Sequence, residues 1–268
     1  MIASITYVKE VMGDLKAKKK YGQNFLIDDN IVDKIAMLSC DEELLSIEIG
    51  PGLGALTEHL LRYGKAVDAY EIDEDMYERL LQNISDERLR VFHQDFLKAD
   101  LSCYQEKVCV CGNLPYYVTT PILFKLFESQ LDIAKITIMV QKEVGERLGA
   151  AVNSADYGAL SIEVQYLYDV VKQFNVPRTV FYPQPNVDSM VLSLLPKRKR
   201  DRAFEQQLFT LVKNCFRMRR KTLYNNLKDL YDPEMIAEIY AQLSLPENVR
   251  AQELTLEDYE AMCRVIYY

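Results

Sequence analysis

The sequence has few of the residues that hold metal ions in proteins. Its only histidines are His59 and His93, and none of its six cysteines forms a CxxC pair. Zinc sites are built from such clusters, so we expect no metal site. Cys109 and Cys111 lie two apart in KVCVCG, a pattern typical of a strand that puts both side chains on one side. We interpret them as small buried hydrophobic residues, with a redox pair as the alternative.

The chain also lacks an apolar run as long as a membrane span. Its first 16 residues have no basic head followed by an apolar core, and they contain Glu10 and Asp14, unlike a secretory or transit signal. We therefore expect a cytoplasmic protein without membrane contact. The 268 residues, 49% of them hydrophobic and 27% charged, suit one sizeable domain and a smaller one.

An overall excess of positive charge is absent too, since the net charge is −8. The charge is unevenly distributed, because residues 197–221 contain ten Lys or Arg and two Asp or Glu, a local +8 that leaves −16 for the rest. A local basic surface attracts a polyanion whatever the total charge. We interpret this segment as a nucleic-acid docking surface, with a solvated helix face as the alternative.

What the sequence does contain is a regular alternation of strand and helix patterns. Buried-strand runs at 44–49, 65–72, 89–93, 107–113 and 135–141 alternate with helical spacing at 55–63, 73–84 and 120–129. This order predicts a doubly wound α/β fold with a mainly parallel sheet. An earlier helix is expected at 31–38, with its cap in Asp28-Asp29-Asn30.

The pattern changes in the second half of the chain. Residues 159–168 fit either a helix or a strand, 170–176 and 189–196 fit strands, and a loop with several prolines lies between those two. Helical spacing dominates from about residue 197, in 204–216, 233–243 and 256–266. We predict two domains, 1–196 and 197–268, of which the second is small and all-helical.

A glycine-rich turn follows the first predicted strand, at Gly50, Gly52 and Gly54. Glycines let the backbone turn sharply and approach a ligand, and ligands of such sheets bind beyond the carboxyl ends of the strands. The G-x-G-x-G spacing differs from the dinucleotide-binding G-x-G-x-x-G. Glu71 ends the second strand, where it can accept ribose hydroxyls, and Asp95 follows the third, where it can accept from an adenine amine. Each feature alone fits a turn or a helix cap, but together they favour a site that binds an adenosine group.

The fourth strand ends in Asn113, Leu114, Pro115 and Tyr116. An adenine amine is a poor nucleophile, because its lone pair is delocalised into the ring. The Asn113 side-chain oxygen and the Leu114 carbonyl are placed to accept its hydrogens, and Tyr116 offers a flat face to a base removed from its stack. An ordinary Asn-x-Pro turn is the alternative. Phe181, in the later loop, is a candidate for the other face of the base, with a core phenylalanine as its alternative.

Seven segments, in the same order along the chain, resemble the bacterial rRNA adenine dimethyltransferases, the kasugamycin-sensitivity methylase family. They are KKKYGQNFL, EIGPGLGALT, YEID, HQDFL, NLPYYVTTPI, FYPQPNVDS and FRMRRKTLYNNL. The resemblance runs from about Lys18 to the C-terminus. It implies a class I S-adenosylmethionine-dependent methyltransferase fold, with a Rossmann-like seven-stranded sheet containing one antiparallel strand and a small C-terminal all-helical domain. It further implies dimethylation of the exocyclic amines of two adjacent adenines in the 3′-terminal hairpin of 16S rRNA, in the pre-30S subunit. Loss of such an enzyme gives kasugamycin resistance. We expect a monomer.

The resemblance also implies roles for individual residues, and it makes KKKYGQNFL a flap over the cofactor. The expected contacts of S-adenosylmethionine are Gln23, Asn24, Leu26, Gly50, Gly52, Glu71, Ile72, Asp95, Phe96 and Asn113. The expected catalytic residues are Asn113, Leu114, Tyr116 and Phe181. The expected RNA-binding residues are Lys18, Lys19, Lys20, Lys197, Arg198, Lys199, Arg200, Arg217, Arg219, Arg220 and Lys221.

Three alternative functions remain open. The related large-subunit rRNA methylases of macrolide resistance read Asn-Ile-Pro-Tyr where this chain has NLPY, and RRKTLYNNL fits the small-subunit family better. A ribosome-assembly or transcription factor that keeps the fold without the chemistry is disfavoured by Glu71, Asp95 and Asn113. A nicotinamide oxidoreductase is disfavoured by the glycine spacing.

Overall fold

The computed structural model describes residues 2–14, 23–115, 117–197 and 200–268, and it divides into two compact units. The first unit consists of residues 1–145 and 171–196, and the second of residues 146–170 and 197–268. The chain thus changes unit at 196/197, where we placed the domain boundary. The structure differs from that prediction in one respect, because residues 146–170 belong to the second unit.

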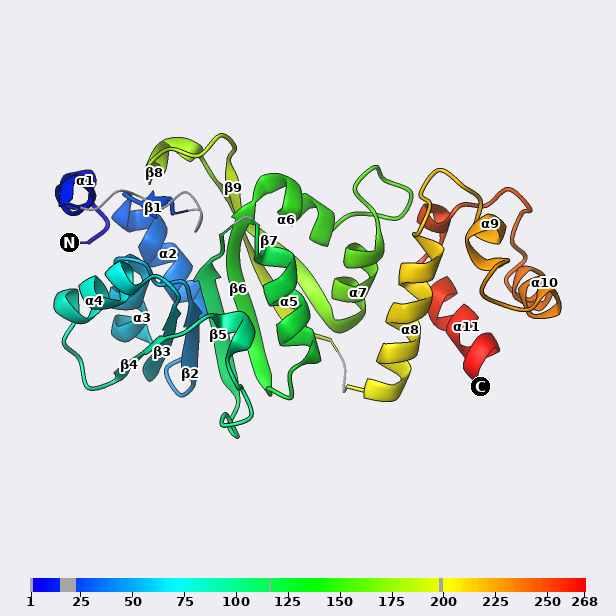
Figure 1. The fold of residues 1–268 in the computed structure, drawn as a ribbon, viewed down its shortest axis with the longest axis horizontal. Coiled ribbons are helices and arrows are strands. Elements are labelled where there is room, and N and C mark those ends of the chain that lie inside the picture. The colour runs from blue at the N-terminus through cyan, green and yellow to red at the C-terminus, as the bar shows by residue number, and fades with distance from the viewer. Residues whose placement is uncertain (1, 15–22, 116, 198–199) are drawn as a thin grey trace. The chain divides into compact units, whose positions relative to one another are not determined.

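The first unit is built on a seven-stranded sheet with the order β4-β3-β2-β5-β6-β9-β7 (Figure 1). Its strands are β2 (Leu45–Ile49), β3 (Ala66–Glu71), β4 (Leu89–His93), β5 (Val108–Asn113), β6 (Ile133–Gln141), β7 (Tyr168–Val176) and β9 (Ser189–Pro196). The neighbouring strands from β4 to β6 are parallel, whereas β9 pairs with β6 in the antiparallel sense. All seven strands were predicted, and the mainly parallel sheet with an antiparallel strand is confirmed.

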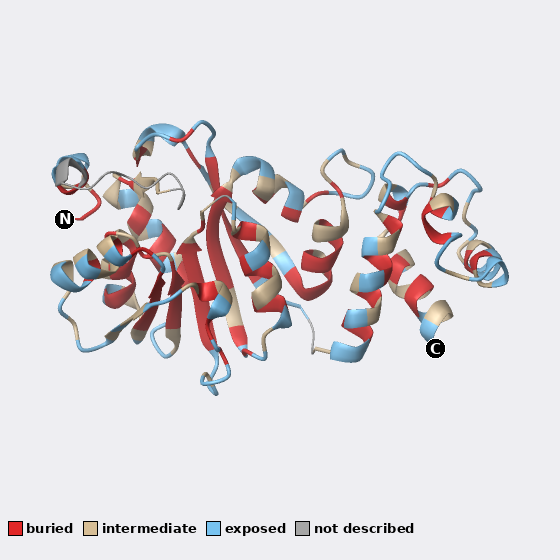
Figure 2. Cartoon of the chain, in the orientation of Figure 1, coloured by how far each residue is buried: buried red, intermediate tan, exposed pale blue. Residues whose placement is uncertain are grey.

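The central strands are buried along almost their whole length (Figure 2). Strands of a parallel sheet are covered on both faces, which is why β2 and β5 read as nearly continuous apolar runs. Gly112 of β5 lies so close to β2 that a Cβ there would stand 2.4 Å from the Ile49 carbonyl oxygen. Cys109 and Cys111 are fully buried in β5, as predicted, and burial raises the pKa of Cys109 to about 11. Both cysteines are therefore packing residues with unreactive thiols at neutral pH.

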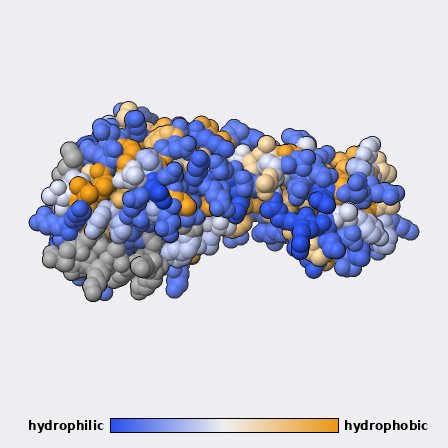
Figure 3. Space-filling view, turned by 90° about the horizontal axis from the view of Figure 1, so that it is seen from above, coloured by the Kyte–Doolittle hydropathy of each residue, from blue (hydrophilic) through white to orange (hydrophobic). Residues whose placement is uncertain are grey.

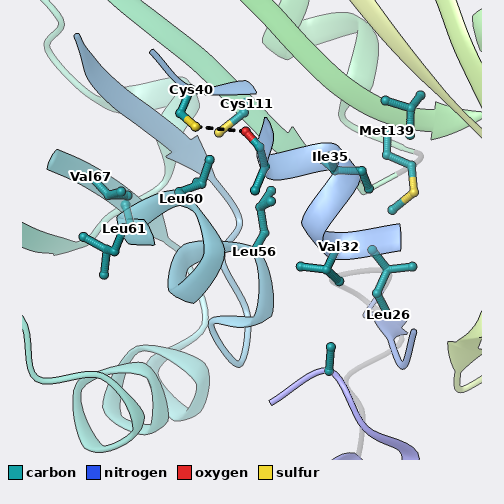
Figure 4. Packing of buried hydrophobic residues seen from close by; sticks show 14 of the residues in the cluster. Leu26, Val32, Ile35, Cys40, Leu56, Leu60, Leu61, Val67, Cys111 and Met139 are labelled. Carbon is teal, nitrogen blue, oxygen red and sulfur yellow. Dashed lines mark hydrogen bonds between the residues drawn. The ribbon is translucent and has the colours of Figure 1, made fainter. Parts of the chain in front are cut away.

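The helices of the first unit are α1 (Ile5–Asp14), α2 (Asp29–Ser39), α3 (Ala55–Tyr63), α4 (Glu74–Asn83) and α5 (Thr119–Glu128), and α6 (Lys142–Leu148) spans the change of unit in the sequence. Of these, α2, α3 and α4 pack on strands of the seven-stranded sheet. The cap predicted before α2 is Asp28, whose carboxylate accepts from the N–H groups of Asn30 and Ile31. In the core, Leu26 and Met139 gather around Val32 and Ile35 of α2 (Figure 4).

Some short elements of the first unit were not predicted. Strand β1 (Phe25–Leu26) pairs antiparallel with β8 (Phe181–Tyr182), which lies in the proline-containing loop. Helix α1 precedes β1 near the N-terminus and was not predicted either. The two strands escaped prediction because they have two residues each and are defined only by their pairing across a long stretch of sequence.

The second unit is helical, as predicted for residues after 197. Its helices are α7 (Ala159–Leu167), α8 (Arg202–Cys215), α9 (Leu223–Leu227), α10 (Pro233–Gln242) and α11 (Leu256–Tyr267). The segment 159–168, for which helix and strand were both open, forms α7. Helix α7 packs on α8 and α11, and its Tyr166 ring lies 5.8 Å from that of Phe209. This apolar contact explains why residues 146–170 belong to the helical unit.

None of the described helices is both long and apolar enough to cross a membrane. The face drawn in Figure 3 is mostly hydrophilic, and its apolar side chains form small separate groups.

Candidate cofactor and active site

One pocket of the first unit brings together all ten residues predicted to contact the cofactor. It opens where β2, β3 and β5 end, beyond their carboxyl ends. The pocket is lined by Gln23, Asn24, Leu26, Gly50, Gly52, Glu71, Ile72, Asp95, Phe96 and Asn113, together with other residues that include Leu114. Because these residues come from five separate stretches of sequence, their convergence is a property of the fold.

The turn after β2 requires its glycines. Gly50, Gly52 and Gly54 have φ values of +70°, +56° and +93°, in the left-handed region that side chains disfavour. A Cβ at Gly54 would also lie 2.6 Å from Leu80 Cδ1. The turn therefore brings bare backbone to the pocket wall, as the sequence predicted.

Glu71 at the end of β3 is held rigidly. Its side chain is buried, with Oε2 accepting from the Gly52 N–H at 3.0 Å and Oε1 from the Asp73 N–H at 2.9 Å. Burial raises the pKa of the Glu71 carboxyl, while the N–H bonds from Asp73 and Gly52 lower it. The helix cap of α4 is Asp73, which accepts from Gln23 Nε2 at 2.8 Å and from Asp75 N at 3.1 Å. Since a carboxylate has about four acceptor positions, Glu71 keeps capacity for ligand hydroxyls.

Asp95 both caps a turn and lines the pocket. It is the N-cap of the 3₁₀ turn Phe96–Lys98, with Oδ1 accepting from Leu97 N at 3.0 Å. Lys125 of α5 holds the end of this turn, because its Nζ donates to Leu97 O at 3.0 Å and to Ala99 O at 2.6 Å. The turn alternative considered for Asp95 is therefore correct, and it coexists with a place at the pocket.

Asn113 lies at the end of β5, on the pocket wall. Its Nδ2 donates to the backbone carbonyl of Asn24 at 3.2 Å, which fixes the amide against the segment before β1. Leu114 N donates to Met139 O at 3.1 Å, and Pro115 O accepts from Val118 N at 3.0 Å. The Asn-x-Pro turn considered as an alternative is thus present, with Asn113 facing the pocket. Tyr116 lies outside the described residues.

Phe181, which was predicted to face a substrate base, is buried in this structure. Phe181 is 3% exposed, belongs to the core cluster with Leu26 and Val32, and is absent from the pocket lining. Its β8 strand pairs with β1 so that Phe181 lies opposite Leu26 and points inward. Tyr117, which was not among the predicted site residues, is 58% exposed and lines the pocket. Its position directly after the NLPY segment could have identified it as a candidate for stacking on a substrate base.

Glu48 is a second pocket residue that was not among the predicted site residues. Its carboxyl is 1% exposed and accepts from Thr57 Oγ1 at 2.6 Å. Its pKa is raised to about 8, mainly by burial and also by the charge of Glu71, while the Thr57 hydrogen bond acts in the opposite direction. The side chain is therefore mostly protonated at neutral pH, as a neutral group in the floor of the pocket.

Some of the predicted RNA-binding residues of the second unit are free to contact RNA, whereas others are bonded within the unit. Arg217, Arg219, Arg220 and Lys221 are exposed after α8, but Arg219 Nη2 donates to Ala155 O at 2.6 Å and to Tyr157 O at 3.1 Å. Arg219 therefore holds a loop of its own unit.

Nearer the start of the unit, Arg200 forms a two-point pair with Glu205, through bonds of 2.7 and 2.6 Å. Lys197 donates to Gln165 O at 3.3 Å, but remains exposed. Lys18, Lys19, Lys20, Arg198 and Lys199 lie outside the described residues.

Comparison with known proteins decides the family. A family model described as ribosomal RNA adenine dimethylase matches residues 14–267. The chain belongs to the ribosomal RNA adenine dimethylase family. It is 42% identical over 245 residues to the ribosomal RNA small subunit methyltransferase A of Mycoplasma mobile, covering 91% of this chain and 96% of that protein. It is 43% identical over 279 residues to the same-named protein of Ligilactobacillus salivarius, covering 96% and 93%.

Solved structures of similar proteins agree with this assignment. A dimethyladenosine transferase from Plasmodium falciparum is similar in structure, with a TM-score of 0.74 and 26% identity. The match covers 88% of this protein and 95% of the Plasmodium chain. The 23S rRNA methyltransferase ErmE is similar with a TM-score of 0.71 at 23% identity, over 91% and 100%, which is a likeness of fold. The fold is that of the class I S-adenosylmethionine-dependent methyltransferases.

Proposed function

We propose that this chain transfers methyl groups from S-adenosylmethionine to the exocyclic amines of two adjacent adenines in the 3′-terminal hairpin of 16S rRNA. It acts as a cytoplasmic monomer on the pre-30S subunit. The observation that carries the proposal is the convergence of Gly52, Glu71, Asp95 and Asn113 on one pocket. Family membership and relatives named for the small ribosomal subunit support the substrate.

The pocket residues fit S-adenosylmethionine. Glu71 is a fixed acceptor for the ribose hydroxyls, and Asp95 is an acceptor for the adenine amine. Ile72 and Phe96 add apolar surface to the pocket wall, which suits the adenine ring. When bound, this cofactor supplies an electrophilic methyl on a sulfonium.

Asn113 orients the attacking amine. Its N–H is used by the Asn24 carbonyl, so its Oδ1 serves as an acceptor for one amine hydrogen, and the Leu114 carbonyl serves for another. Both contacts favour a tetrahedral nitrogen with a directed lone pair. A bound S-adenosylmethionine would supply the methyl group and its sulfur would keep the electron pair of the broken bond, while the amine held by Asn113 and the Leu114 carbonyl would lose its proton to water. The protein accelerates this transfer by alignment and exclusion of water.

The flipped adenine is held by stacking. Tyr117 is the exposed aromatic side chain at the pocket, and Tyr116 next to it is the residue first predicted for this role. A base–aromatic stack contributes about 1–3 kcal/mol, which offsets the few kcal/mol of unstacking. The RNA backbone docks on Arg217, Arg220 and Lys221 of the second unit, whose side chains are exposed.

The experiment that tests this function measures methyl transfer to separated ribosomal subunits. Subunits from a strain that lacks this gene are incubated with the protein and labelled S-adenosylmethionine, and the rRNA nucleosides are then identified. We expect dimethyladenosine in the small-subunit rRNA alone, and a strain without the gene to resist kasugamycin. Label in the large subunit would instead favour the macrolide-type methylases, whose fold is shared. Cofactor binding without transfer would favour an assembly factor.

A further inference from the structure

Helix α1 lies outside the part of the chain that defines the family. The family model matches residues 14–267, whereas α1 is formed by Ile5–Asp14. The match therefore includes the last residue of the helix only. In Figure 1 the helix lies beside β1 and β8, and it packs on β8.

The inner side of this N-terminal segment is apolar and buried. Ile2 and Val8 are 9% and 1% exposed, and they form a cluster with Val11, Leu53 and Met76. Leu53 stands between Gly52 and Gly54 in the turn after β2, and Met76 lies in the first turn of α4. The cluster therefore joins α1 to the glycine turn and to the start of α4, both next to predicted cofactor contacts.

Polar contacts fix the helix to the same turn. The Tyr7 hydroxyl donates to Asn83 Oδ1 at the end of α4, and Asn83 Nδ2 donates to Leu53 O at 2.9 Å. Asn83 thus connects α1 to the backbone of the glycine turn. Lys9 Nζ lies 5.6 Å from the centre of the Tyr182 ring, a second attachment on the β8 side.

Ile2 and Val8 also line the pocket itself, along with Gly52 and Glu71. We propose that residues 2–11 form an additional wall of the S-adenosylmethionine site, which shields the bound cofactor from water and holds the glycine turn in its binding conformation. The inference rests on the proposed use of this cofactor. Apolar groups at a pocket wall exclude water and so strengthen the hydrogen bonds of nearby groups such as Glu71.

Calorimetric titration of the full chain with S-adenosylmethionine and with S-adenosylhomocysteine tests the proposal. The variants are Val8→Ala, which removes apolar surface from the wall, and Tyr7→Phe, which removes only the hydroxyl that reaches Asn83. The matched control is Thr6→Ala on the exposed side of the same helix. We expect Val8→Ala to weaken binding of both ligands by about tenfold, Tyr7→Phe by roughly threefold, and Thr6→Ala to have no effect.

Thermal unfolding of the ligand-free variants separates this role from a purely structural one. Wild-type dissociation constants for Val8→Ala and Tyr7→Phe, with lowered melting temperatures, would show that α1 only stabilises the fold and would overturn the proposal. A wild-type chain that binds neither ligand would overturn the proposed function as well, which distinguishes the two failures.

Hydrogen exchange supplies an independent measurement on the unaltered protein. If residues 2–11 form a wall of the cofactor site, S-adenosylmethionine slows amide exchange in α1 as well as in the glycine turn. Slower exchange in the turn with unchanged exchange in α1 would contradict the proposal.

Discussion

The side-chain amide of Asn113 donates a hydrogen bond to the backbone carbonyl of Asn24, with Nδ2 and O 3.2 Å apart. The two residues come from the end of β5 and from the segment before β1, so the bond closes one side of the pocket. It also fixes the orientation of the amide, because one N–H of Nδ2 is used within the protein. The oxygen is then left for the substrate amine, which is the basis of the proposed chemistry.

Replacing Asn113 with alanine removes that oxygen while leaving the rest of the pocket in place. We expect the rate of methyl transfer at saturating cofactor to fall by roughly 10²-fold or more, because the amine is no longer aligned. Single-turnover transfer to small-subunit particles gives the rate, and filter binding gives RNA affinity, which we expect to be unchanged. Normal turnover in this variant would mean that the catalytic assignment is wrong.

Glu71→Gln removes one acceptor oxygen of a buried carboxylate that two backbone N–H groups hold in place. Hydrogen bonds to charged groups contribute about 1.5–3 kcal/mol, so we expect the dissociation constant of S-adenosylmethionine to rise roughly 10- to 100-fold. Glu74→Gln, an exposed change three residues further on, is the control and should bind normally. Equal affinities of the two variants in calorimetry would exclude Glu71 from the cofactor site.

The raised pKa of Glu48 makes the free energy of unfolding depend on pH. Its folded-state pKa of about 8 lies above the ordinary value of 4.5, so between these values the folded state binds more protons than the unfolded state. The contribution of Glu48 to the free energy of unfolding is therefore fully present below about pH 4.5 and is lost as pH rises through about 8. Urea unfolding of Glu48→Gln should lack this decline, whereas Glu43→Gln on the exposed turn before β2 should keep it. Parallel pH profiles of wild type and Glu48→Gln would contradict the assignment.

If the exposed basic residues after α8 bind RNA phosphates, RNA binding depends on the salt concentration. Reversing Arg217, Arg220 and Lys221 to glutamate should weaken rRNA binding and reduce the slope of log K against log salt by about 2, because each phosphate that a basic residue neutralises adds roughly 0.7 to that slope. Reversing Lys34, Lys107 and Lys172 together makes the same change in net charge elsewhere and serves as the control. Arg219 stays unaltered, since its guanidinium holds Ala155 and Tyr157. An unchanged slope would remove the patch from the interface.

Features encoded by nearby residues could be predicted from the sequence. The strands, the glycine turn and the cap at Asp28 each depend on a few adjacent positions. The convergence of Glu71, Asp95 and Asn113 followed too, because the carboxyl ends of neighbouring parallel strands meet at one edge of the sheet.

Features decided by distant contacts could not be predicted. The inward orientation of Phe181 results from pairing with Leu26, more than 150 residues earlier, and nothing in FYPQPNVD encodes it. Helix α1 has no acidic residue in its first turn and no basic residue in its last, so its ends carry no charge signal. The use of Arg219 within its own unit likewise depends on the 154–158 loop, far away in the sequence.

A crystal structure of the protein with S-adenosylmethionine bound tests the central claim most directly. The account predicts the ribose hydroxyls on Glu71, the adenine amine on Asp95, and the methyl group turned towards Asn113 at the mouth of the pocket. A sulfonium bound away from Asn113, with that side chain facing the protein interior, would contradict it.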